Sequence, residues 1–150
     1  MTMDLNAELY RTAASTFEEV GFIFLLPEMN DEQREAGLEA AVSVEFDGPS
    51  RGRLVLAAHG GLMPALAANM LGEDEPPSVS HQHDALGEIA NVICGNLLPR
   101  IAGTKSVFRI AAPKAMDTEE LASCAREPNA AEVQLPLEDG RADVTLFMRQ

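Results

Sequence analysis

The strongest constraint on the fold is the alternation of apolar residues near the end of the chain. Val133, Leu135 and Leu137 occupy every second position, and residues 142–148 alternate again after the dipeptide at 139–140. A period of two is typical of a strand with one buried face. Because Asp-Gly is a favoured two-residue turn, the segment is predicted to be a β-hairpin.

A second hairpin is predicted in the first half of the chain. Residues 40–46 alternate, residues 47–50 (Asp-Gly-Pro-Ser) have the composition of a turn, and residues 53–58 form the return strand. Strands joined by such short turns pair in antiparallel fashion. The sheet is therefore expected to be antiparallel.

Three segments have the spacing of three or four between apolar residues that indicates a helix. They cover residues 5–26, 60–71 and 80–102, and a further strand is predicted over residues 105–112. The predicted order is α-β-β-α-α-β-β-β, an α+β fold with an antiparallel sheet and long helices packed on one face.

Two boundaries of these helices have local signals. Ser78 or Ser80 can cap the longest helix and Gly103 can end it. Gly72 can stop the helix before it, and residues 72–78 then form an acidic connector.

Composition excludes several classes of function. The 150 residues include 24 acidic and 11 basic side chains, a formal net charge of −13, which disfavours binding to nucleic acid or to an anionic membrane. No apolar run reaches the ~20 residues of a membrane span, and the first residues do not resemble a secretory signal. Cys94 and Cys124 are interpreted as reduced thiols, so we expect a cytoplasmic protein.

The length suits one domain over residues 1–150, and that domain shows a faint internal repeat. Residues 19–27 and 88–99 both have an acidic residue, an apolar run and then Leu-Leu-Pro. Two readings remain open: two related halves with pseudo-two-fold symmetry, or the ordinary similarity of two apolar helices.

The longest predicted helix carries a polar ridge. At about 100° per residue, Asp84, Glu88, Asn91 and Gly95 fall within roughly 60° of one another. The ridge could be an ordinary solvent-facing surface. However, Asn is a poor residue for a helix interior, and acids four residues apart repel each other. Gly95 leaves the surface low beside Asn91, so a partner could approach closely.

An amide and a carboxylate on one helix face can form half of a hydrolytic active site. The amide of Asn91 can orient a water molecule, and Glu88 can pair with a lysine. The chain has no phosphate-binding loop and no basic cluster beside the ridge in the sequence. A second protein would have to supply the phosphoryl group, the metal and the cations.

The pattern Asp84-x-x-x-Glu88-x-x-Asn91 resembles the signature of the CheC/CheX/FliY chemotaxis phosphatases. Pro113 lies 22 residues after Asn91, one short of the usual spacing of the proline in that signature. The acidic composition, the predicted order of elements and the LAANMLGEDEP run before the signature are also similar. A single Glu/Asn ridge is most like CheX, because the equivalent pattern in the first half has Phe22 in place of Asn.

The resemblance implies hydrolysis of the aspartyl-phosphate of a CheY-like response regulator. Asn91 would position the attacking water, Glu88 would pair with the regulator's lysine, and Asp84 and Gly95 would contact the partner. This chain would bind no cofactor, because the Mg²⁺ would belong to the regulator. The alternative is a non-catalytic dimeric adaptor that binds a response regulator or a motor component.

The resemblance also implies a homodimer joined through the sheet. We expect Phe147 on the polar side of the C-terminal strand, where it would be unusual at an open edge, and this favours the same assembly.

Other candidate sites are weaker. His81 and His83 point about 200° apart on a helix, so they would not chelate one metal ion together. His59 has no nucleophile at a recognisable spacing, and Gly60-Gly61 lacks the Lys and Ser or Thr of a phosphate-binding loop.

Overall fold

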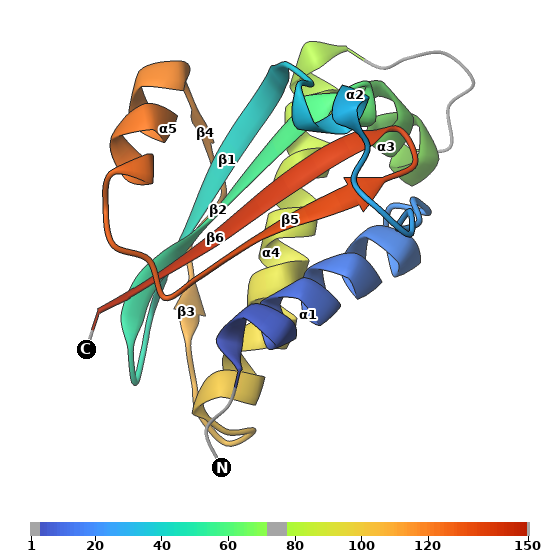
Figure 1. Ribbon diagram of the computed structural model, residues 1–150. Helices are drawn as coiled ribbons and strands as arrows, with labels where there is room; N and C mark the ends of the chain where they lie inside the picture. Colours follow the sequence, from blue (N-terminus) through green and yellow to red (C-terminus); the bar gives the residue numbers. More distant parts are fainter. Residues whose placement is uncertain (1–3, 72–77, 150) are drawn as a thin grey trace.

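The structure, a computed structural model, describes residues 4–71 and 78–149 (Figure 1). The helices are α1 (Leu5–Glu19), α2 (Asp31–Arg34), α3 (Leu62–Leu71), α4 (Val79–Ala102) and α5 (Thr118–Ala125). The strands are β1 (Leu38–Asp47), β2 (Arg51–Gly60), β3 (Arg109–Ile110), β4 (Lys114–Met116), β5 (Ala131–Leu137) and β6 (Gly140–Arg149). Gly72 and most of the predicted connector lie outside the described residues.

All six strands form one antiparallel sheet, which confirms the predicted α+β fold. The order is β3-β1-β2-β6-β5, and β4 pairs with β1 beside β3. Both predicted hairpins are present as β1–β2 and β5–β6. The turns and alternating residues that predicted them therefore also determine the register of the sheet.

The predicted extent of the strand over residues 105–112 is wrong. Only Arg109 and Ile110 form β3, because the amide of Ser106 instead closes a turn on the carbonyl of Gly103. Pro113 has no amide hydrogen and separates β3 from β4. The chain then forms α5, a short helix that the predicted order of elements did not include.

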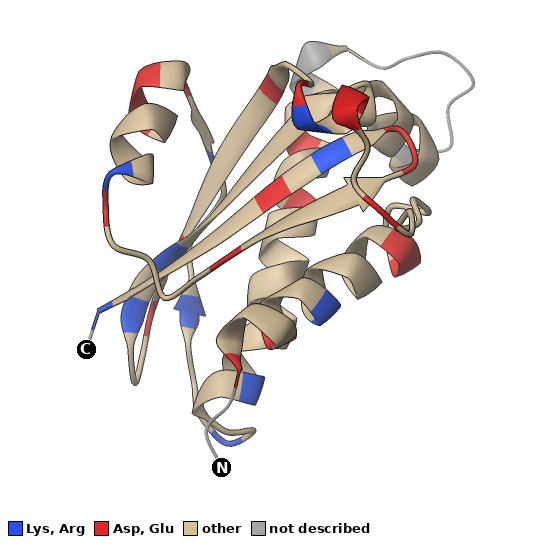
Figure 2. Ribbon diagram, in the orientation of Figure 1, with Lys and Arg blue, Asp and Glu red and all other residues tan. Residues whose placement is uncertain are grey.

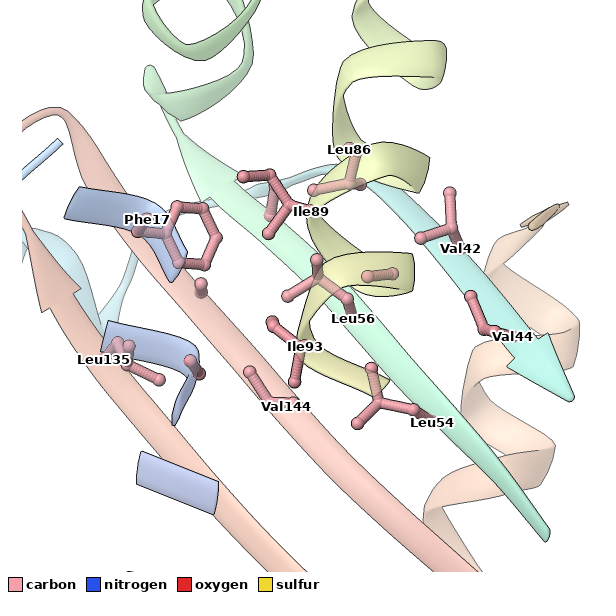
Figure 3. Close-up of a cluster of buried hydrophobic side chains, with 14 of the residues drawn as sticks. Phe17, Val42, Val44, Leu54, Leu56, Leu86, Ile89, Ile93, Leu135 and Val144 are labelled. Carbon is pink, nitrogen blue, oxygen red and sulfur yellow. The ribbon is translucent and has the colours of Figure 1, made fainter. Parts of the chain in front are cut away.

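The main hydrophobic core lies between one face of the sheet and helices α1 and α4. Figure 3 shows Phe17 of α1 and three residues of α4 pointing toward apolar side chains of the strands. The fully buried members of α4 include Leu86, Ile89 and Ile93. The side of residues 80–102 that was predicted to be apolar is thus the side that docks on the sheet.

Helix α1 is shorter than the predicted span of residues 5–26. It ends at Glu19, and Phe22 then takes a left-handed conformation with φ 53°. The next residues bond to the second half of the chain: the amide of Leu26 donates to the carbonyl of Pro136 at 2.8 Å. Residues after Gly21 therefore run beside β5, and this long-range pairing replaces the continued helix.

The opposite face of the sheet has a smaller apolar cluster beneath α5. Val55, Phe147 and Cys124 are its buried members. Strand β6 lies between β2 and β5, but β5 pairs with it only as far as Leu146, and Phe147 pairs with Arg53 of β2 alone. The burial of Phe147 is therefore explained within the chain, so this residue gives no support to the expected dimer, which stays a prediction.

Two further sequence features can be compared with the structure. Cys94 and Cys124 are both free and buried, and burial raises the pKa of the Cys94 thiol to about 12.

None of the helices in residues 4–71 and 78–149 combines the length and the apolar character needed to cross a bilayer.

The packing of α4 generates a prediction on stability. Replacing Ile93 by Ala should lower the free energy of unfolding by about 2–5 kcal/mol, because it leaves a cavity among fully buried side chains. Asn96 is exposed on the same helix, and Asn96→Ala should change stability by about 0.5 kcal/mol or less. Urea unfolding of both variants measures the difference, and equal losses would contradict this account of the core.

Candidate functional site: a polar ridge on helix α4

The ends of α4 are fixed by its flanking residues. The hydroxyl of Ser78 accepts a hydrogen bond from the amide of His81 at 3.3 Å, and Gly103 ends the helix with φ 103°. Such a positive φ favours glycine, since it lacks a β-carbon. The helix therefore has the length and caps predicted from the sequence, with Ser78 as the N-cap.

The four predicted ridge residues face away from the core. Asp84, Glu88 and Gly95 are exposed and Asn91 is partly buried, whereas Ile89 on the same helix is fully buried. Spacings of four, three and four keep the four positions in one line along the helix. The fold thus places all four predicted site residues in one line on the side of α4 away from the sheet, with three of them exposed and Asn91 partly buried.

Asn91 has an unusual hydrogen-bonding state. Its side-chain oxygen Oδ1 is buried and accepts no hydrogen bond from any described residue. An unsatisfied buried acceptor costs about 1–3 kcal/mol, and a catalytic role is one explanation for such a group. A half-turn about the Cβ–Cγ bond would exchange the amide oxygen and nitrogen, so the group can present either a donor or an acceptor to a partner.

Pro113 packs against α4 one turn before Asn91. A β-carbon added to Gly87 would come within 3.0 Å of Pro113 Cβ and 3.1 Å of Pro113 Cγ. Because Gly87 and Asn91 are four residues apart, the segment that contains Pro113 borders the ridge on the side of Asn91. The proline was predicted from the sequence as part of the signature, whereas Gly87 was missed. A glycine inside a long helix was the available signal for such a close contact.

The other end of the ridge is open. A β-carbon added to Gly95 would meet no heavy atom of the described residues within 4 Å. The packing of the described residues therefore does not require a glycine at position 95. Its effect is to leave the helix surface low beside Asn91.

The ridge does not enclose a substrate by itself. Glu88 and Asp84 form no ion pair with any described residue. Two cavities in the described part of the chain are lined by residues of the sheet and of the region around α5, and neither includes a ridge residue. The ridge can orient a small molecule through the amide and accept a cation through the carboxylate, but the reacting group must come from outside.

The first half of the chain does not repeat this arrangement. Ser15 and Glu19 are exposed on α1, but Phe22 lies beyond the end of the helix and is 62% exposed. The three residues therefore do not form a ridge like that of α4, whatever the residue at position 22.

The histidines lie apart from the ridge chemistry. Burial is the main cause that lowers the pKa of His59, whose Nδ1 lies 3.8 Å from Oδ2 of Asp143 in the sheet. Over residues 4–71 and 78–149, no three His, Cys, Asp or Glu side chains come together in a way that could hold a metal ion.

Comparisons with known proteins agree with the resemblance seen in the sequence. The family model described as chemotaxis phosphatase CheX matches residues 40–138. The crystal structure of CheX from Vibrio vulnificus is 17% identical with a TM-score of 0.70, over 98% of this chain and 97% of that one. CheX from Desulfovibrio desulfuricans is 14% identical with a TM-score of 0.72, over 98% and 100% of the two chains.

A third structure is the CheX–CheY–BeF3–Mg²⁺ complex from Borrelia burgdorferi. It is 16% identical to this chain with a TM-score of 0.68, over 99% of this chain and 100% of that one. A search of curated proteins finds no match. At these identities the structural likeness establishes a shared fold, and the family model adds the match in sequence.

The two helix glycines generate a prediction. Gly95→Ala should raise the free energy of unfolding by about 0.5–1 kcal/mol, because alanine is the better helix former and has space there. Gly87→Ala should give a smaller gain or a loss, since Pro113 must move. Chemical denaturation of both variants compares them, and an equal gain at both positions would contradict the contact between Gly87 and Pro113.

Proposed function

The chain belongs to the family of the chemotaxis phosphatase CheX, and we propose that it hydrolyses the aspartyl-phosphate of a CheY-like response regulator. The observation that carries this proposal is the placement of Glu88 and Asn91 on one solvent-facing ridge of α4. The CheX–CheY–BeF3–Mg²⁺ complex of a relative with the same fold supports the choice of partner.

In the proposed reaction, Glu88 and Asn91 enter the active site of the regulator. The amide of Asn91 holds a water molecule in line with the bond between the phosphorus and the aspartyl oxygen. The water oxygen bonds to phosphorus, the aspartyl oxygen leaves with the electron pair, and the products are the free carboxylate and inorganic phosphate. Oδ1 of Asn91 is buried in the free chain, so this task requires a half-turn about the Cβ–Cγ bond that brings the amide oxygen to the surface in place of the nitrogen.

Glu88 supplies the second contact. Its exposed carboxylate forms no ion pair with a described residue and can accept hydrogen bonds from the ammonium group of a lysine on the regulator. The Mg²⁺ is held by the regulator, and no residue of this chain is assigned to it. Asp84 contacts the partner one turn before Glu88, and Gly95 lets the two surfaces approach closely beyond Asn91.

The domain organisation, the location and the oligomeric state of the protein are also proposed. We propose that residues 1–150 act as one domain, in the cytoplasm, and as a homodimer joined through the sheet. The reasoning from Phe147 does not support this dimer, since that residue is buried within its own chain. The dimer therefore depends on the family resemblance and on the exposed backbone groups that any sheet edge offers.

The proposed activity has a direct test. The protein should shorten the lifetime of a phosphorylated CheY-like receiver in the presence of Mg²⁺. Asn91→Ala should slow this reaction by about 10²-fold or more, as expected when one positioning group for the attacking water is removed. Glu88→Ala should also slow it, and radiolabelled phosphoryl loss measures each rate.

The control is Asn96→Ala, which removes an exposed amide of α4 that lies off the ridge and should leave the rate unchanged. A wild-type protein that binds the receiver without shortening its lifetime would favour the non-catalytic adaptor. Acceleration that survives both ridge substitutions would show that the site is wrongly assigned.

The homodimer is tested by its mass. Sedimentation equilibrium at micromolar concentration should give twice the chain mass of 16.1 kDa. A single species at the mass of one chain would contradict the dimer and leave the assignment of the ridge untouched.

A further inference from the structure

A cluster of arginines lines a cavity at one end of the sheet. The cavity has a volume of about 670 Å³, and Arg51, Arg53, Arg109 and Arg149 are four of its lining residues. Figure 2 shows the corresponding blue segments gathered where β2, β3 and the end of β6 meet. The chain has only 11 basic residues and a net charge of −13, so more than a third of its cations lie in one place.

The antiparallel register brings these arginines to the same face. Arg51 pairs with Arg149, Arg53 pairs with Phe147, and Asp47 pairs with Arg109. Directly opposed residues of antiparallel strands project on the same side. Because Phe147 packs in the cluster beneath α5, this is the face opposite to the one that α4 covers.

Acidic neighbours neutralise only part of this charge: Glu45, Asp47 and Glu127 also line the cavity, so its four arginines exceed its acids by one charge. Arg53 forms an ion pair with Glu127, and Arg51 lies 3.5 Å from Asp47. Arg109 and Arg149 are exposed and form no ion pair with any described residue. Like charges directly opposite one another in a sheet are destabilising, and Arg51 opposite Arg149 is such a pair. A bound anion would remove this repulsion.

The cavity also has apolar walls. Arg53 lies over the ring of Phe147 with its guanidinium carbon 4.9 Å from the ring centre, and Ile110 is 37% exposed. The volume falls within the roughly 300–1,000 Å³ of small-molecule sites, which combine apolar walls with a few directed polar groups. Guanidinium groups bind phosphate or carboxylate through two parallel hydrogen bonds.

We propose that this cavity binds a small organic anion with two or more negative charges, carried by phosphate or carboxylate groups. Arg109 and Arg149 bind the charged groups, Arg51 shares one of them, and Phe147 and Ile110 contact the apolar part. The proposal concerns the face of the sheet opposite to α4 and does not depend on the phosphatase activity.

Calorimetric titration of the full chain tests the proposal, with ADP, pyrophosphate and citrate as probes in buffer free of other multivalent anions. At least one probe should bind in a saturable manner with one site per chain. Binding of ADP or pyrophosphate but not citrate would identify phosphate as the preferred group, and the reverse result would identify carboxylate. Absence of saturable binding for all three probes at millimolar concentration would overturn the proposal.

The decisive variant is the double substitution Arg109→Gln with Arg149→Gln, which removes two exposed side chains without an ion pair to a described residue. It should weaken binding by about 100-fold, as expected for the loss of two charge-assisted contacts. Its matched control is Arg11→Gln with Arg34→Gln, which changes the net charge equally at exposed positions outside the cavity. Equal weakening in the control would attribute binding to the overall charge and overturn the site.

Thermal unfolding provides a second measurement that does not rely on heats of binding. The best-bound probe should raise the melting temperature of the wild-type protein and of the control variant, because a ligand that binds only the folded state stabilises it. It should not do so for the double variant of Arg109 and Arg149. A similar rise in all three proteins would contradict the assignment of these arginines.

Discussion

The burial of one side of α4 against the sheet is the interaction on which the candidate site depends. Leu86, Ile89 and Ile93 are fully buried, and a shift by one residue would turn the helix by about 100° and expose them. Their burial therefore fixes which residues face outward. Glu88 and Asn91 owe their common direction to the apolar residues behind them, and not to any contact between themselves.

The parts of the fold that could be predicted from the sequence depend on local signals. Ser78 and Gly103 mark the ends of α4, and short turns mark both hairpins. The end of α1 could not be predicted in this way, because residues beyond Glu19 have helical spacing. Their conformation is decided by the bond from Leu26 to Pro136, which belongs to a strand far along the chain.

The difference between local signals and long-range contacts also explains which of the two sites could be predicted. The ridge was predictable because its residues lie on one helix, where spacing alone determines which side chains share a face. Gly87 signals a close contact, but its partner Pro113 was not predictable, since that depends on where β3 and β4 join the sheet. The arginine cavity was missed for a related reason: its members come from three strands whose neighbours are known only once the sheet order is known.

One segment borders both the arginine cavity and the ridge. Arg109 lines the cavity, the amide of Ala111 donates to the carbonyl of Glu45 at 2.8 Å, and Pro113 contacts Gly87 beside Asn91. Strand β3 pairs with β1 through only two residues, fewer than any other pair of strands in this sheet. The segment that joins the two surfaces is therefore held to the sheet by few backbone bonds, and its position depends also on the contact of Pro113 with α4.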